Sequence, residues 1–263
     1  LAQRQQETTE AVAIGLMALS DGRSDEANKA ALKARRAMPE AELSLMLSAQ
    51  TARLNGDFEQ EEGFYRRMID GPASQREKKH ENRTAIMGLR GLLRLSVERG
   101  HFKDVRTHAM RALEMAPKTD WAMEAMFHLE ARNADWQKAQ HWLKQMSRNH
   151  FIEKPEHNRH LAVLLVAEAE GLGQTEISED RQKAIKKIMH ALKLAPDFVP
   201  GYIRAAHWLA GAGVGQKRKF ASQIERAWKR HPHPELIIAY QALFPGRSAV
   251  QSLKAIQKLI APR

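Results

Sequence analysis

The amino-acid sequence predicts an all-α protein built as an α-solenoid of stacked helix pairs. Three observations lead to this fold class: an alanine-rich composition, a regular spacing of short polar turns, and a helix ending that recurs along the chain. The 263 residues include 39 alanines, whereas aromatic residues make up only 6%. Alanine favours helices and lets them approach closely, while strands need β-branched and aromatic side chains. We therefore expect helices and no sheet.

The polar turns give the period of the array. Gly22, Gly56, Gly100 and Ala134 each open a short turn between two expected helices. Gly22 and Gly56 are 34 residues apart, as are Gly100 and Ala134, whereas Gly56 and Gly100 are separated by 44 residues. A helix–turn–helix period of about 34 residues is typical of the tetratricopeptide repeat. The wider interval indicates an insertion of about ten residues between the second and third pairs.

A proline closes several of the predicted pairs, with an alanine five residues before it. The four examples are Ala34 with Pro39, Ala112 with Pro117, Ala191 with Pro196, and Ala227 with Pro232. A small residue allows a helix crossing, and proline then stops the helix because it lacks a backbone N–H. We expect Ala112 and Ala191 to be buried at such crossings.

In chain order, the turns and prolines define six helix pairs and a cap within one repeat domain, 1–263, expected to form a right-handed superhelix. The pairs cover 8–39, 41–70, 84–117, 119–149, 156–196 and 198–232, and the cap covers 234–261. Phe58, Phe102 and Trp136 share one repeat position and are predicted to pack between the helices of their pairs. The polar insertion 71–83 offers no apolar residues to bury, so it is predicted to be mobile.

Composition and motifs argue against an enzyme. The chain has no cysteine, which rules out disulfides, thiolate metal sites and a cysteine nucleophile. Gly211–Gln216 lacks the last glycine of a dinucleotide fingerprint and is interpreted as a turn. His157 and His160 are three residues apart, but Pro155 and Glu156 favour a polar helix start over a metal site. We expect no catalytic residue, cofactor or metal.

Several segments resemble the soluble part of the HemY-like membrane proteins of proteobacteria. They are 13–19, 45–52, 88–92, 133–136, 194–197 and 227–234, while the insertion 71–83 departs from that pattern. The resemblance implies two transmembrane helices ahead of Leu1, which would anchor this domain to the bacterial inner membrane, with the basic composition favouring the cytoplasmic face. It also implies an association with late haem biosynthesis, with membrane-associated enzymes of that pathway as partners and no assigned catalytic residue.

In a repeat array the first helix of each pair lines a concave groove, and resemblance to the tetratricopeptide repeat family implies that partner contacts come from a few positions on those helices. The corresponding residues are Gln50, Arg53, Met87, Arg90, Arg94, Trp121, Glu124, His128 and Arg132. Four are arginines, whose planar guanidinium groups bind carboxylates through two hydrogen bonds. We expect these arginines to converge as uncompensated charges that bind a partner protein or acidic peptide. Arg94→Glu should then weaken binding with little effect on thermal stability.

Three alternatives stay open. Some of the groove residues can simply face water and solubilise the surface. The groove could also bind porphyrin or haem directly, with arginines taking the propionates. The net charge of +11 and the pI near 9.9 are consistent with nucleic-acid binding. However, the basic residues are mixed with acids, no nucleic-acid motif is present, and aromatic residues are too few for a stacking surface. A protein-interaction scaffold is therefore favoured.

Overall fold

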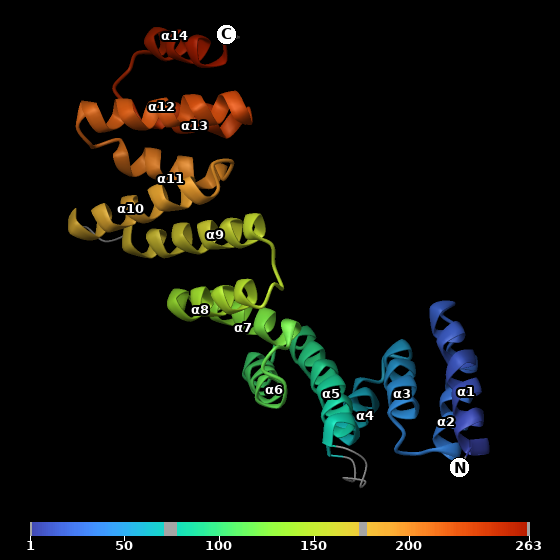
Figure 1. Ribbon diagram of the computed structural model, residues 1–263. Coiled ribbons are helices and arrows are strands. Elements are labelled where there is room, and N and C mark those ends of the chain that lie inside the picture. The colour runs from blue at the N-terminus through green and yellow to red at the C-terminus, as the bar shows by residue number, and fades with distance from the viewer. Residues whose placement is uncertain (1, 71–77, 174–177, 262–263) are drawn as a thin grey trace. The chain divides into compact units, whose positions relative to one another are not determined.

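The computed structural model describes residues 2–70, 78–173 and 178–261, with 78–82 and 178 described by their backbone alone. These described residues form fourteen α-helices and no strand (Figure 1). The predicted all-α class is thus confirmed. The chain divides into two compact units, Leu1–Leu129 and Glu130–Arg263.

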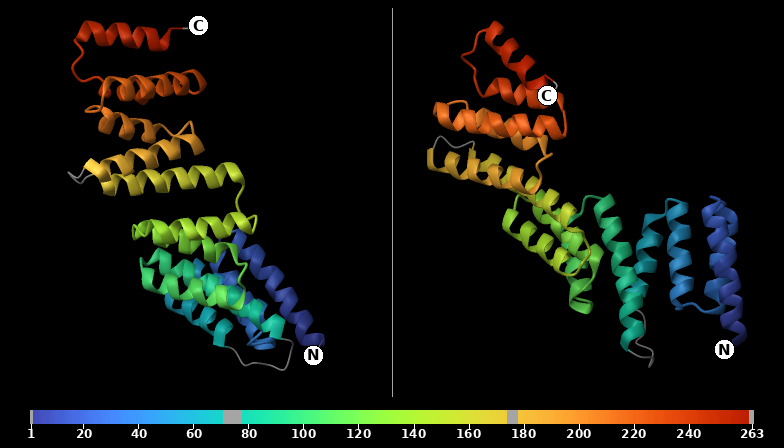
Figure 2. Two further views of the ribbon diagram at one scale, coloured as in Figure 1. Left: turned by 60° about the vertical axis from the view of Figure 1, so that its left-hand side comes forward. Right: turned by 45° about the horizontal axis from the view of Figure 1, so that its top comes forward.

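The first unit contains six complete helices and most of a seventh. They are α1 (Ala2–Ser20), α2 (Ser24–Ala37), α3 (Glu42–Leu54), α4 (Phe58–Asp70), α5 (Lys78–Glu98), α6 (Phe102–Met115) and α7 (Asp120–Arg132), whose last three residues belong to the second unit. Each helix from α1 to α5 packs against the next, and α1 also packs against α3. Figure 2 shows α1 to α4 side by side. Gly15 permits the α1–α3 contact, because a Cβ there would lie 2.6 Å from Leu47 Cδ1.

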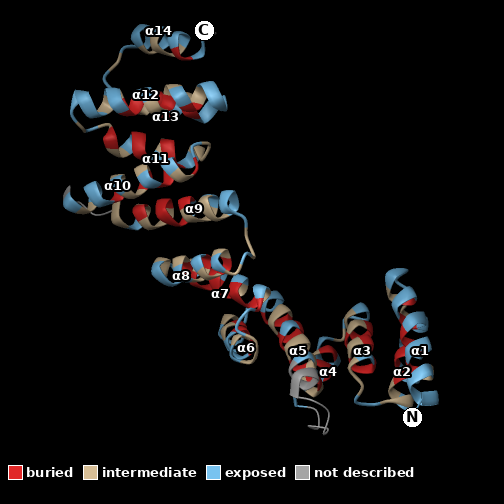
Figure 3. Ribbon diagram, viewed as in Figure 1, coloured by how far each residue is buried: buried red, intermediate tan, exposed pale blue. Residues whose placement is uncertain are grey.

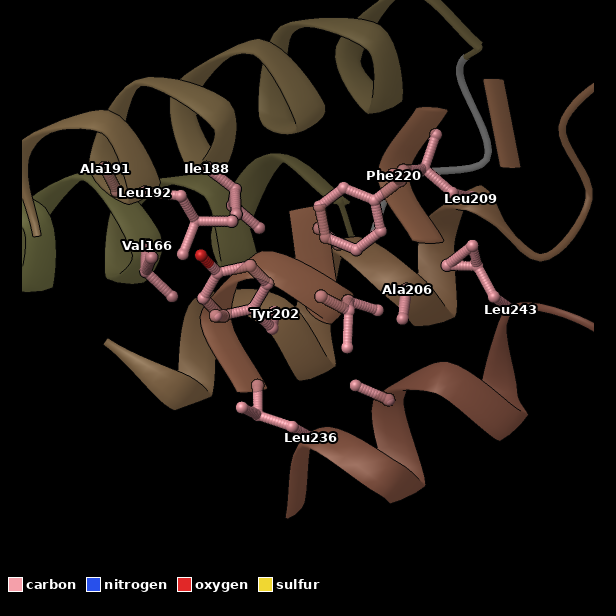
Figure 4. Close-up of a cluster of buried hydrophobic side chains, with 14 of the residues drawn as sticks. Val166, Ile188, Ala191, Leu192, Tyr202, Ala206, Leu209, Phe220, Leu236 and Leu243 are labelled. Atoms are coloured by element: carbon pink, nitrogen blue, oxygen red, sulfur yellow. The ribbon is translucent and has the colours of Figure 1, made fainter. Parts of the chain in front are cut away.

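The second unit continues with seven helices. They are α8 (Trp136–Arg148), α9 (Lys154–Gly173), α10 (Ser178–Leu194), α11 (Val199–Leu209), α12 (Val214–Arg230), α13 (Pro234–Ala242) and α14 (Ala249–Ile260). Neighbouring helices from α8 to α13 pack on one another, and α12 also contacts α14. The buried faces of α9 to α14 form one apolar core, in which Ile188, Leu192, Tyr202 and Phe220 lie together (Figure 4).

The polar turns adopt the conformation that glycine favours. Gly22, Gly56 and Gly100 have φ values of +70°, +72° and +71°, and Ala134 has +56° at the equivalent position. In each turn, the residue that directly follows the left-handed one donates its backbone N–H to a carbonyl oxygen five residues before itself. Arg23, for example, donates to Ala18 at 2.8 Å. This bond closes the helix in a Schellman-type cap. The spacing of the turns therefore marks real helix ends.

The predicted helix endings are also confirmed. Helices α2, α6, α10 and α12 end two residues before Pro39, Pro117, Pro196 and Pro232. Ala112 and Ala191 are fully buried, as expected for small residues at helix crossings. Figure 3 shows the same pattern, with buried residues on the packed faces of the helices and exposed residues on the opposite faces.

Three sequence expectations need correction or lie partly beyond the described residues. Phe58 is 49% exposed rather than packed between helices, whereas Phe102 and Trp136, which open α6 and α8 as Phe58 opens α4, are half-buried. Helix α5 begins at Lys78, so residues 78–83 are helical. The rest of the predicted mobile insertion, 71–77, lies outside the described residues. In the predicted cap, 234–261, α13 contributes side chains to the core, whereas Val250 and Leu253 of α14 are exposed.

Candidate functional site

A polar cluster lies where α3, α4 and α5 meet in the first unit. It comprises Gln50 and Arg53 from α3, Glu61 and Tyr65 from α4, and Arg94 and Glu98 from α5. Two glycines of α5 allow the helices to come this close. A Cβ at Gly88 would lie 2.7 Å from the Tyr65 carbonyl oxygen, and one at Gly91 would overlap the Tyr65 ring. The tyrosine therefore fits against the bare backbone of α5.

Glu61 is the centre of the cluster and has no exposed surface. Its Oε1 accepts a hydrogen bond from Arg94 Nη2 at 2.5 Å, and Arg53 Nη1 lies 3.6 Å from the same oxygen. Its Oε2 is buried and has no hydrogen-bond partner among the described residues. A buried carboxylate is costly unless a cation compensates it. The two arginines are thus part of the structure that makes this burial possible.

Tyr65 links the carboxylate to the α3 side of the cluster. Its hydroxyl accepts hydrogen bonds from Gln50 Nε2 and from Arg94 Nη2, both at 3.1 Å. Burial raises the pKa of Tyr65 above its usual value, and the nearby Glu61 carboxylate adds to that rise. The phenol therefore stays protonated at neutral pH and acts as a fixed hydrogen-bonding group.

Glu98 forms the outer edge of the cluster and is 38% exposed. Its Oε1 lies 2.7 Å from Arg53 Nη2 and 4.0 Å from Arg94 Nε. The hydrogen bond from Arg53 to Glu98 is the main cause of a raised Arg53 pKa, so the guanidinium is firmly charged. Two guanidinium groups and two carboxylates therefore balance one another, and one of the carboxylates faces water.

The structure brings together only part of the predicted groove. Gln50, Arg53 and Arg94 belong to the cluster. Met87 is half-buried and packs against the apolar core beside it, whereas Arg90 is exposed and forms no ion pair within the described part of the chain.

The predicted residues on α7 lie elsewhere. Trp121 is half-buried, and the exposed Glu124 and His128 have Oε1 and Nε2 3.8 Å apart. No hydrogen bond or ion pair joins these three residues to the cluster within the described part of the first unit. Arg132 is an exposed residue of the second unit.

The expectation of uncompensated arginines was wrong for Arg53 and Arg94. Both are neutralised by Glu61 and Glu98, which the sequence analysis did not single out. One signal was available: Glu61 falls in the apolar stripe of α4 with Tyr65 and Met68, at helical spacing. A carboxylate on a buried stripe requires a cation from another helix.

Over the described ranges, no helix combines the length and apolar character needed to cross a membrane. The same residues contain no group of three or more His, Cys, Asp or Glu side chains that could hold a metal ion.

Comparison with known proteins relates the fold to solved structures. No protein-family model matches the chain, and no curated protein matches its sequence significantly. PilF of Pseudomonas aeruginosa is similar with a TM-score of 0.50 and 14% identity, over 91% of this chain and 97% of that one. A chain of the complex of Naa15 and Naa10 bound to HypK-THB is similar with a TM-score of 0.55 and 16% identity.

That second match covers 98% of this chain but only 37% of the other, so this chain spans just over a third of its length. At these identities the likeness concerns the fold alone. Together with the capped turns and the packed helix pairs, it identifies the chain as an α-solenoid of tetratricopeptide-like helix pairs.

Proposed function

We propose that this chain is a non-enzymatic scaffold that binds an acidic segment of a partner protein at the polar cluster of α3, α4 and α5. One observation carries the proposal: the partly exposed Glu98 carboxylate lies against Arg53 and Arg94, and Arg90, which has no ion pair among the described residues, lies one helical turn before Arg94. The Glu98 side chain thus occupies a site that is suited to the carboxylate of a partner. Guanidinium groups bind carboxylates through geometrically matched hydrogen bonds.

Exchange of one carboxylate for another has a low cost at this site. Glu98 is at the edge of the cluster, so it can turn to water when a partner's carboxylate takes its place. Glu61 stays buried beneath and keeps the two guanidinium groups in position, which limits the ordering cost of binding. Arg90, which forms no ion pair within the described residues, adds attraction for an acidic segment. The likeness to a chain of the Naa15/Naa10 assembly also supports a role in binding proteins.

The test uses a fluorescently labelled peptide of six glutamates, with a six-lysine peptide as the charge-reversed control. Glu98→Gln should tighten glutamate-peptide binding by about threefold or more, because the internal competitor loses its charge. Glu59→Gln removes the same charge from an exposed position on α4 and should have a much smaller effect.

Arg90→Gln should weaken binding, whereas Arg36→Gln on α2, also exposed and unpaired within the described residues, should have little effect. Both arginine variants lower the net charge equally. Equal effects within each pair of variants would show that only net charge matters and would remove the cluster from the proposal.

From the sequence resemblance to the HemY-like proteins, we further propose that the full protein is tethered to the bacterial inner membrane, with this domain on the cytoplasmic face. Its partner would be a membrane-associated enzyme of late haem biosynthesis. Crosslinking in intact membranes, followed by purification of the full-length protein, tests this assignment. Recovery of no such enzyme would contradict it. A Soret titration of the purified chain with haem tests direct porphyrin binding, which an unchanged spectrum would exclude.

A further inference from the structure

A pocket of about 600 Å³ lies within the second unit, between α10, α12 and the end of α11. It belongs to helices other than those of the polar cluster and plays no part in the function proposed above. Pockets of about 300–1,000 Å³ are typical of sites for small molecules. The pocket therefore has the size to hold a ligand, and its lining indicates which kind.

The floor of the pocket is apolar. Its members come from all three helices: Ile185, Met189, Trp208, Leu209 and Phe220. Leu209 and Phe220 are buried members of the core of this unit (Figure 4). The indole of Trp208 lies against Gly173 of α9, where a Cβ would overlap the ring. The floor is thus an opening onto a packed core, and it can take an apolar group without rearrangement.

Cations surround this floor. Arg181 and Lys186 from α10 and Lys219 from α12 line the pocket, and all three are exposed. None of them forms an ion pair within the described part of the chain, and no acidic residue is among the described residues that line the pocket. Three glutamines, Gln182, Gln216 and Gln223, complete the polar lining.

The nearest acids along α10 and α12 are already engaged. Glu179 and Asp180 lie 3.2 Å and 3.3 Å from Lys183 Nζ, which is not part of the lining. Glu225 accepts a hydrogen bond from the Tyr240 hydroxyl at 3.4 Å. No ion pair among the described residues therefore compensates the positive charge at the pocket, and an anion placed there is attracted by all three cations.

We propose that this pocket binds a small amphiphilic anion, with its apolar body on the floor and its acidic group among Arg181, Lys186 and Lys219. Each half of the lining selects one half of such a molecule. The apolar floor favours burial of hydrocarbon, and the unpaired cations favour a carboxylate or a similar acidic group. The glutamine amides can donate further hydrogen bonds to that group.

The experiment measures binding of dodecanoate to the full chain by calorimetry, below the concentration at which it forms micelles. Two control ligands separate the contributions: dodecyltrimethylammonium keeps the apolar body with the opposite charge, and acetate keeps the carboxylate alone. We expect binding of dodecanoate only. Its addition should also change tryptophan fluorescence, and Trp208→Phe should remove most of that change. Equal binding of the anionic and cationic ligands would overturn the proposal, as would no detectable binding of dodecanoate.

Variants then locate the site. Lys186→Gln and Lys219→Gln should each weaken dodecanoate binding by roughly threefold to fivefold. Lys217→Gln removes the same charge from α12 outside the pocket and should leave binding unchanged. Gln216→Trp, at an exposed lining position, should block the pocket while thermal unfolding stays as in the wild type. Unaltered affinity in Gln216→Trp, or equal losses in Lys217→Gln and Lys219→Gln, would place the ligand elsewhere. Binding of the glutamate peptide should be unaffected by Lys219→Gln, so the two proposals can fail separately.

Discussion

Glu61 places a charge on the buried face of α4, whose other members are Phe64, Tyr65 and Met68. Its neighbours Glu59 and Glu62 also carry carboxylates, but only Glu61 is fully enclosed. A buried ion pair contributes little net stability compared with apolar residues, yet removal of one partner leaves an uncompensated charge. Stability of the first unit should therefore depend on Arg94 and not on Arg90.

Arg94→Met should lower the free energy of unfolding by about 2–3 kcal/mol, somewhat less than for a fully buried pair, because the Arg94 side chain is 38% exposed. This replaces the sequence-based expectation that a change at Arg94 would leave stability unaltered. In a Glu61→Gln background the same change should cost less than half as much, since no buried charge is left behind. Urea unfolding of the four variants measures the coupling. Arg90→Met is the exposed control, and an equal loss in Arg90→Met and Arg94→Met would contradict the account.

The three tyrosines of the chain, Tyr65, Tyr202 and Tyr240, all have a pKa raised above the usual value, and burial is the main cause in each. The folded protein thus holds these protons more tightly than the unfolded chain. Their contribution to stability is complete below the unfolded tyrosine pKa of about 10 and is lost as the pH rises through the folded values. Titration of phenolate absorbance should show native midpoints above those of the urea-unfolded protein. Superimposable curves would mean that the phenols are not buried in solution.

At the scale of single elements, the turn at Ala134 stands out. It has the same left-handed conformation as the turns at Gly22, Gly56 and Gly100, but its residue carries a Cβ. For L-residues this conformation costs roughly 1–2 kcal/mol. The backbone bonds that close α7 hold it in place, because Asp135 donates its N–H to Glu130 at 2.9 Å.

Ala134→Gly should therefore raise the free energy of unfolding by about 0.5–1 kcal/mol, since the strain relieved exceeds the added entropy of the unfolded chain. The reciprocal change Gly22→Ala should lower it by a similar amount. No atom lies within 4 Å of a Cβ at Gly22, so only the backbone conformation is tested there. Thermal melts of the two variants provide the measurement. Loss of stability in Ala134→Gly would mean that the alanine methyl makes a favourable contact.

The sequence predicts the helices and turns more completely than it predicts the polar cluster. The turns at Gly22, Gly56 and Gly100 need a left-handed backbone conformation, which glycine favours. Residue type and spacing were therefore sufficient to predict where the helices end. The burial of Glu61 depends on contacts with α3 and α5, which are remote in sequence, and the adjacent glutamates look the same in a linear reading. Arg53 and Arg94 could be assigned to one place by the repeat register. Their pairing with Glu61 and Glu98 could not, because the register says nothing about which side chains of neighbouring helices meet.

For the molecule as a whole, the contacts of each unit run mainly between helices close in sequence. Stability in such an array is a sum of local terms and nearest-neighbour interfaces. Disturbance of one unit should then spread along its own helices first and reach the other unit weakly.

Ala112→Leu tests this, because Ala112 is fully buried in α6 and overpacking should cost about 1–3 kcal/mol. Hydrogen exchange should show lost protection in α5 and α6, while α9 to α12 keep wild-type protection. Ala13→Leu makes the same change at an exposed position of α1 and should alter neither set. Uniform loss of protection through both units in Ala112→Leu would show that the chain unfolds as a single block.

The enclosed carboxylate of Glu61 also has a consequence for synthesis on the ribosome. Its closest cation, Arg94, lies 33 residues further along the chain and leaves the exit tunnel later. Until then α3 and α4 can associate only by leaving Glu61 with Arg53, whose Nη1 is 3.6 Å from it in the finished fold. The nascent α3–α4 pair should therefore stay open to water at Glu61 until α5 has emerged, and the packing of α3, α4 and α5 should consolidate in one step when α5 arrives.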